Sequence, residues 1–138
     1  MISLRIKNMD YKCRIYLHSN LTMEELTDSV ANLYQGEGTG LGIIVTAWAE
    51  IYIFENSDYK RGRTYEFPDG FLYFKYIIFI DPLPVKIDFQ DFLIKTINVL
   101  YFFWNQNYPA VAACDFEDEL PNKGGYKSLD VPWPGSIS

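Results

Sequence analysis

The sequence has few of the residues on which redox, zinc and histidine-based chemistry depend. One histidine, His18, and two cysteines, Cys13 and Cys114, occur among its 138 residues. Two cysteines make no disulfide framework, and with one histidine they are too few for an ordinary structural zinc site. No Ser-His-Asp or Cys-His arrangement can be assembled around His18, so we interpret it as a structural residue. We expect no cofactor and no enzymatic activity.

Basic residues and long apolar runs are also scarce. Lysine and arginine total 12 against 18 aspartates and glutamates, which gives a net charge of -6. This balance argues against nucleic acid and anionic membranes as partners, and it favours a basic protein. No apolar stretch reaches the roughly 18 residues of a membrane span. The first ten residues do not resemble a signal peptide, so we expect a cytoplasmic protein with reduced thiols.

Apolar and aromatic residues, in contrast, are plentiful. They include 49 % hydrophobic residues and 17 % aromatic residues, enough to fill one core. We expect a single α+β domain over residues 1–120 and a C-terminal tail, residues 121–138, that packs on it. Residues 71–80 (FLYFKYIIFI) are apolar on both alternating faces and lie between Asp-Gly and Asp-Pro turns. They predict a central strand that is covered on both sides.

The other elements can be placed around this strand. Alternating residues predict one or two strands over 2–18, with a possible turn at 8–10 and the sheet strand at 12–18. Thr22 and Glu25 form a capping-box pattern that begins a helix, which Gly36 ends. Asp88 caps a second, more apolar helix. Residues 43–54 predict a strand with a bend at 47–49, residues 56–70 a long hairpin loop, and residues 110–114 a final strand.

The glycine-rich residues 36–42 (GEGTGLG) are not a good phosphate loop. A phosphate loop runs from a strand into a helix N-terminus, whereas this segment leaves a helix and carries Glu37. We interpret it as a flexible connection.

The order strand, helix, strand, strand, helix, strand predicts a ferredoxin-like split β-α-β sandwich, an antiparallel sheet with two helices on one face. In this topology residues 12–18 and 71–80 are central, and residues 110–114 lie at an edge beside the first strand. Cys13 and Cys114 should therefore lie on neighbouring strands. The second sheet face needs a cover, for which the tail, a homodimer and a partner protein are alternatives. The tail would contribute Tyr126, Leu129, Val131 and Trp133.

Residues 115–119 (DFEDE) carry four carboxylates directly after the edge strand. Such a cluster can be solvated, pair with the basic first strand, bind a basic protein, or hold a hard cation. The spacing is not that of an EF-hand, and we predict no metal site. The candidate partner-binding residues are Asp115, Glu117, Asp118, Glu119 and Tyr126.

Residues 104–126 contain the sequence PAVAACDFEDELP followed by Gly124-Gly125-Tyr126, and residues 69–74 read DGFLYF. Together these segments resemble small bacterial proteins of the kind that accompany polymorphic toxins as immunity proteins. The resemblance implies a protein that binds and inhibits a toxin, and it transfers no catalytic residues. Two alternatives are a small-molecule-binding or metal-dependent enzyme with its site near residues 115–119, and a homodimeric structural module.

Overall fold

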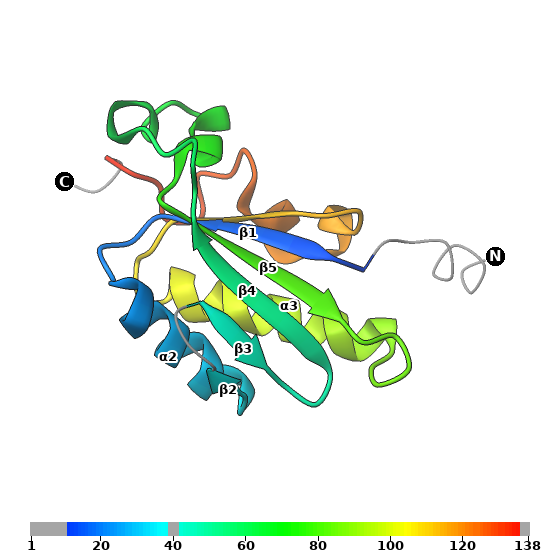
Figure 1. Cartoon of the computed structure of the whole chain (residues 1–138). Coiled ribbons are helices and arrows are strands. Elements are labelled where there is room, and N and C mark those ends of the chain that lie inside the picture. Colours follow the sequence, from blue (N-terminus) through cyan, green and yellow to red (C-terminus); the bar gives the residue numbers. More distant parts are fainter. Residues whose placement is uncertain (1–10, 39–41, 136–138) are drawn as a thin grey trace.

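A computed structural model describes residues 11–38 and 42–135 of the chain (Figure 1). The alternating segment at residues 2–10 and the last three tail residues lie outside the described part. The strands are β1 (Cys13–Leu17), β2 (Glu37–Gly38), β3 (Ile43–Val45), β4 (Ala49–Glu55), β5 (Tyr76–Pro82) and β6 (Ala110–Ala113). The α-helices are α2 (Met23–Tyr34) and α3 (Phe89–Trp104). Four short 3₁₀ helices are η1 (Arg61–Arg63), η2 (Asp69–Tyr73), η3 (Glu117–Glu119) and η4 (Pro121–Gly125).

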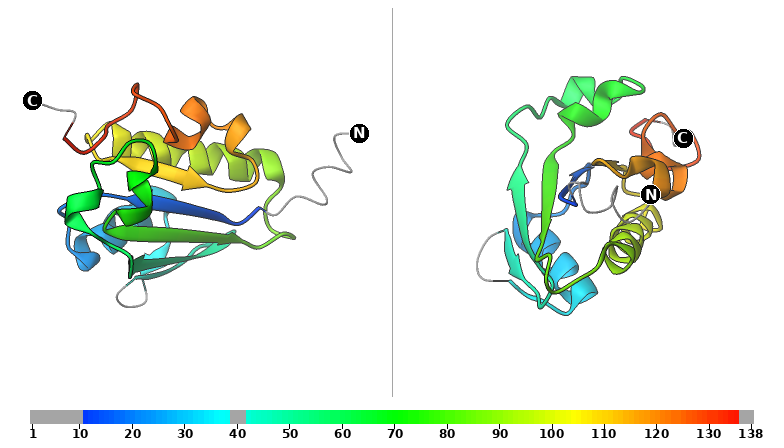
Figure 2. Two further views of the ribbon diagram at one scale, coloured as in Figure 1. Left: turned by 90° about the horizontal axis from the view of Figure 1, so that it is seen from above. Right: turned by 90° about the vertical axis from the view of Figure 1, so that its right-hand side faces the viewer.

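The described strands form one antiparallel sheet in the order β2-β3-β4-β5-β1-β6. The predicted α+β class and split β-α-β arrangement are confirmed, with β1 and β5 inside the sheet and β6 at the edge beside β1. Both α-helices cover the same face (Figure 2). Alternate strand residues such as Ile15, Ile51 and Ile78 are fully buried in the core beneath these helices.

The two helices begin where their capping residues predict. The Thr22 hydroxyl accepts from the Glu25 amide at 3.1 Å, and the Glu25 carboxylate accepts from the Thr22 amide at 2.9 Å. Asp88 accepts from the Asp91 amide at 2.9 Å at the start of α3. The first helix ends through Gln35, which has a left-handed φ of 54°, immediately before the predicted Gly36.

The predicted strand at residues 71–80 is wrong in its first half. Residues 69–73 form η2, and β5 begins only at Tyr76. The Asn56 side chain donates hydrogen bonds to the Leu72 carbonyl at 2.9 Å and the Phe74 carbonyl at 2.8 Å. These bonds join the beginning of the loop to its end. They use carbonyl groups that a strand would pair with its neighbours, so they override the strand preference of the aromatic residues.

A second correction concerns residues 43–54, which form a hairpin of β3 and β4 instead of one bent strand. The Thr46 hydroxyl accepts from the amides of Trp48 at 3.1 Å and Ala49 at 2.8 Å, which stabilises the turn. The glycine-rich segment, predicted to be a flexible connection, contains a short strand: Glu37 and Gly38 form β2 and pair with β3. A side chain at Gly36 would clash with Thr46 and the Val45 carbonyl, since an added Cβ would lie 2.8 and 2.9 Å from their nearest atoms.

The second sheet face is covered in part by two segments of the chain itself. The loop at residues 56–75 and the tail contribute aromatic side chains to a small cluster on this face, consisting of Phe71, Phe74, Val111 and Trp133, with Tyr16 and Tyr126 at its margin. Val131 joins the helix-side core instead, and Leu129 is 78 % exposed. Away from this cluster, β3 and β4 expose Ile43, Val45 and Phe54 by 42–46 %.

Candidate functional site

The acidic segment, residues 115–119, is anchored to the protein core by the residues within and after it. Phe116 is buried and packs edge-on against Phe89 and Phe92 of α3, with ring centroids 5.5 and 5.8 Å apart. Leu120 is also buried, and η3 lies between these two anchors. Asp115, Asp118 and Glu119 are exposed, whereas Glu117 is half-buried. The segment therefore presents carboxylates from a fixed backbone.

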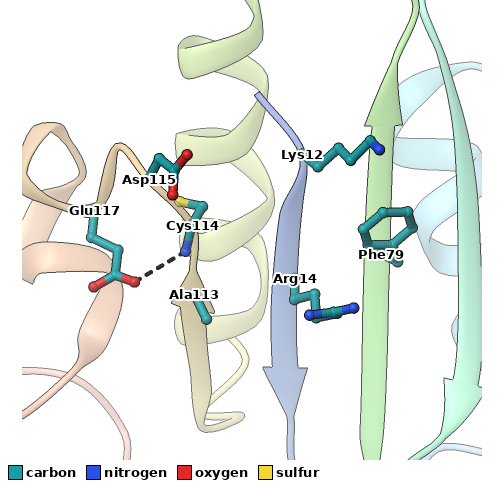
Figure 3. A pocket seen from close by; sticks show the side chains of 7 residues that line it. All are labelled: Lys12, Arg14, Phe79, Ala113, Cys114, Asp115 and Glu117. Carbon is teal, nitrogen blue, oxygen red and sulfur yellow. Dashed lines mark hydrogen bonds between the residues drawn. The ribbon is translucent and has the colours of Figure 1, made fainter. Parts of the chain in front are cut away.

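The Glu117 side chain forms a hydrogen bond with the backbone at the end of the edge strand. Its Oε2 accepts a hydrogen bond of 3.0 Å from the Cys114 amide (Figure 3). Its carboxylate is thus held next to β6, and the segment turns away from the sheet.

The outer side of β6 is covered along its length. The Trp104 indole donates to the Ala110 carbonyl at 3.0 Å. Gly124 and Gly125 lie directly against β6, with left-handed φ values of 75° and 97°. An added Cβ at Gly125 would lie 2.7 Å from the Ala110 carbonyl oxygen, so this close approach requires glycine.

A cavity of about 460 Å³ opens beside the acidic segment, and we name it the strand cavity. Charges of both signs line it. Figure 3 shows Lys12 and Arg14 extending from the β1 side towards β5, while Asp115 and Glu117 lie on the β6 side. The Arg14 guanidinium carbon is 5.6 Å from the Phe79 ring centroid, a cation–π distance. The remaining lining residues are Ala113 and Cys114.

A second cavity of about 240 Å³ lies beyond Glu117 and shares Ala113 and Glu117 with the first. Tyr126 lines it and donates a hydrogen bond of 2.9 Å to Asp69 Oδ1. This hydrogen bond, followed by partial burial and the charges of Asp69 and Glu117, raises the pKa of the Tyr126 hydroxyl. Its ring also packs edge-on against Phe71 at 5.6 Å.

The structure thus separates the predicted partner-binding residues into three places. Asp115 and Glu117 line the strand cavity, and Glu117 and Tyr126 line the second cavity. Asp118 and Glu119 line neither of these two cavities and face solvent.

Sequence reasoning did not select Lys12, Arg14 and Phe79, although the alternation of residues 12–18 indicated which side chains share a face. Asp69 and Phe71 were assigned to a turn and a strand, so nothing indicated that they would approach Tyr126.

His18 lies at the end of β1 against Phe74, with ring centroids 5.4 Å apart. Burial, and then the charge of Lys75, lower its pKa below the ordinary value of 6.5. Within the described residues its buried Nδ1 has no hydrogen-bond partner.

Across residues 11–38 and 42–135, no three histidine, cysteine, aspartate or glutamate side chains are grouped closely enough to hold a metal ion. Over the same residues, neither α2 nor α3 is sufficiently long and apolar to span a membrane.

No protein-family model matches the chain, and no curated protein or solved structure is significantly similar to it.

Proposed function

We propose that this chain is a protein-binding domain, an immunity-type inhibitor that neutralises a bacterial toxin by covering it with an acidic surface. The observation that supports this proposal is the anchoring of residues 115–119. Phe116 and Leu120 are buried on either side of η3, while Asp118 and Glu119 remain exposed. A pre-formed charged surface loses little conformational freedom when it binds.

The charge of the chain supports a basic protein as the class of partner. The chain carries a net charge of -6, and the exposed carboxylates of the acidic segment add a local concentration of negative potential. A basic protein would be attracted over long range and oriented during encounter, while nucleic acid would be repelled. A toxin domain that acts on nucleic acid in the cytoplasm has such a basic surface.

Within this surface the residues have different roles. Asp118 and Glu119 have exposed side chains that can contact the partner, and Asp115 is exposed beside them. Glu117 holds the Cys114 amide, so it supports the shape of the segment. Tyr126 lies at the margin, where its hydroxyl is engaged by Asp69.

The test uses the product of the neighbouring gene and two variants of equal charge. Asp118→Lys with Glu119→Lys, and Glu24→Lys with Asp28→Lys on α2, each change the net charge from -6 to -2. We expect the first pair of substitutions to slow association about tenfold at low salt and to weaken protection of cells that produce the toxin. The second pair, on the helix face, should have a clearly smaller effect. Equal effects of the two variants would contradict an acidic surface at residues 115–119.

A small-molecule site is a second candidate, favoured by the opposite charges in the strand cavity. Lys12 and Arg14 face one part of the cavity and Asp115 and Glu117 the other, which suits a ligand with both an anionic and a cationic group. Thermal-shift measurements with free amino acids as trial ligands distinguish the two functions. A shift that Arg14→Gln abolishes would support this candidate, and protein association should not require Arg14.

The homodimeric module remains a separate prediction. Ile43, Val45 and Phe54 provide exposed apolar side chains on the second sheet face. Sedimentation across a range of concentrations tests it, and a monomer at all concentrations would remove it.

A further inference from the structure

Cys13 begins β1 and Cys114 directly follows the neighbouring antiparallel strand β6. The two side chains interact, so the two cysteines are close together. The register pairs Arg14 with Ala113 and Ile15 with Ala112. One step further along the same register brings Cys13 opposite Cys114. Both cysteines are free thiols, and both contact the helix-side core.

The hydrogen-bond pattern shows which kind of pair this is. The backbone amide of His18 donates to the Pro109 carbonyl at 2.9 Å, so His18 and Pro109 form a hydrogen-bonded pair. Hydrogen-bonded and non-hydrogen-bonded pairs alternate along antiparallel strands, which makes Cys13 and Cys114 a non-hydrogen-bonded pair. The Cys114 amide agrees with this assignment because it donates outward to Glu117.

Non-hydrogen-bonded pairs are the closer pairs of an antiparallel ladder. Their Cα atoms are about 4.5 Å apart. A disulfide spans Cα distances of roughly 4.4–6.8 Å. A backbone pair of this kind is therefore at a separation that a disulfide can bridge.

The two thiols differ in access. Cys13 is only 1 % exposed, whereas Cys114 is half-buried and lines the strand cavity (Figure 3). A hydrogen bond with the Cys114 side chain, followed by burial and the nearby charges, raises the pKa of the Cys13 thiol. A reagent that enters the strand cavity should therefore react first at Cys114.

We propose that Cys13 and Cys114 are an oxidisable pair that forms a cross-strand disulfide by exchange with a small disulfide such as oxidised glutathione. Cys114 loses its proton to water, and its thiolate attacks one sulfur of the oxidised glutathione. The glutathione S–S bond breaks, and one glutathione leaves as a thiolate that takes up a proton. Cys13 then loses its proton and attacks Cys114 Sγ, which releases the second glutathione. Two protein thiols are oxidised and one glutathione disulfide is reduced.

The new bond would join the edge strand to the central strand β1. Cys114 directly precedes the acidic segment, so the disulfide would also fix the beginning of that segment. This inference does not depend on a toxin partner, since it concerns only two residues of this chain and a general thiol reagent.

The full chain is incubated in glutathione buffers of graded redox potential, and its thiols are counted after denaturation. We expect both thiols to disappear together, the mass to fall by two hydrogen atoms, and a non-reducing peptide map to link Cys13 with Cys114. A lasting glutathione adduct on Cys114, a disulfide-linked dimer, or two thiols that persist in fully oxidised buffer would each overturn the proposal.

Two further measurements test the order of events and the role of the fold. In Cys13→Ala, the reaction should stop at a glutathione adduct on Cys114, and circular dichroism confirms that this variant is folded. In the unmodified chain, unfolding in urea should lower the equilibrium constant for disulfide formation on the order of a hundredfold. The reason is thermodynamic linkage: if the disulfide stabilises the folded chain, then folding favours disulfide formation by the same factor. An equilibrium constant unchanged by urea would show that the sheet does not hold the two thiols together.

Discussion

The Tyr126 hydroxyl donates a hydrogen bond of 2.9 Å to Oδ1 of Asp69, a residue 57 positions earlier in the chain. The bond joins the C-terminal segment to η2, and together these segments cover part of the second sheet face. It therefore connects the tail, which the sequence predicts as a possible cover, to a loop that the sequence predicts only as a hairpin connection.

Tyr126→Phe removes this hydrogen bond and retains the ring contact with Phe71. We expect a lower urea midpoint than in the unmodified protein. Tyr101→Phe is the matched control, because Tyr101 is exposed on α3, and it should leave the midpoint unchanged. The pKa of Tyr126 is raised above its ordinary value of 10.0, so the stabilisation is present below pH 10 and is lost as the pH rises further. Identical midpoints for the two variants would contradict a stabilising bond.

Phe116→Ala should remove the main anchor of the acidic segment. Phe116 is 1 % exposed, and truncation of a buried phenylalanine costs about 3–5 kcal/mol of unfolding free energy. Phe116→Leu retains most of the buried volume and should cost clearly less. Urea unfolding measures both values, and a cost below about 1 kcal/mol for the alanine variant would show that Phe116 does not anchor the segment.

Asn56→Ala tests the closure of the loop at residues 56–75. The change leaves the Leu72 and Phe74 carbonyls without their donor, and a lost buried hydrogen bond with an unsatisfied partner costs about 1–3 kcal/mol. Asn98→Ala on the exposed side of α3 provides the control. Amide hydrogen exchange should also become faster around η2 in the Asn56 variant, and unchanged exchange would contradict the role assigned to Asn56.

Gly125→Ala should be much more destabilising than Gly62→Ala. Gly125 has a φ of 97° and lies against the Ala110 carbonyl, whereas an added Cβ at Gly62 meets no atom within 4 Å. A non-glycine residue in a left-handed conformation costs about 1–2 kcal/mol before the steric clash is added. Thermal unfolding compares the two variants, and equal melting temperatures would be inconsistent with close packing of η4 on β6.

His18 should make the protein less stable as the pH falls below 6.5. Burial lowers the pKa of His18 in the folded chain, so the unfolded chain binds the proton first. The contribution of His18 to stability is therefore fully present well above pH 6.5, and it falls as the pH drops from 6.5 to the folded pKa. His18→Gln should have a smaller loss between pH 7 and pH 5, and an NMR titration of this single histidine measures the folded pKa directly. A folded pKa at or above 6.5 would contradict the prediction.

The parts of the fold that were predictable depend on residues close together in sequence. Thr22 with Glu25, and Asp88 with Asp91, begin their helices through hydrogen bonds within one turn. The alternation of residues 12–18 likewise identified β1. From these local patterns and the order of the elements, the neighbouring positions of Cys13 and Cys114 could be predicted.

The errors arise where distant residues decide the conformation. Asn56 bonds to carbonyls 16 and 18 residues away, which no local pattern of aromatic residues could indicate. The acidic candidates Asp115 and Glu117 were found because they form a dense run of one charge. Lys12 and Arg14 were visible only as a basic strand, because their place in the strand cavity depends on the register of β1 with β6.

The covered outer side of β6 has a consequence for how other chains can associate with this protein. The Ala110 carbonyl and the Cys114 amide are already occupied by Trp104 and Glu117. At the opposite end of the sheet, β2 contributes two residues of backbone within the described part of the chain. Neither edge therefore offers many free backbone groups with which a strand of another chain could pair. Such pairing is how fibrils form and how peptides bind by β-augmentation. A partner must recognise side chains, and its specificity can change by single substitutions without any change in the backbone.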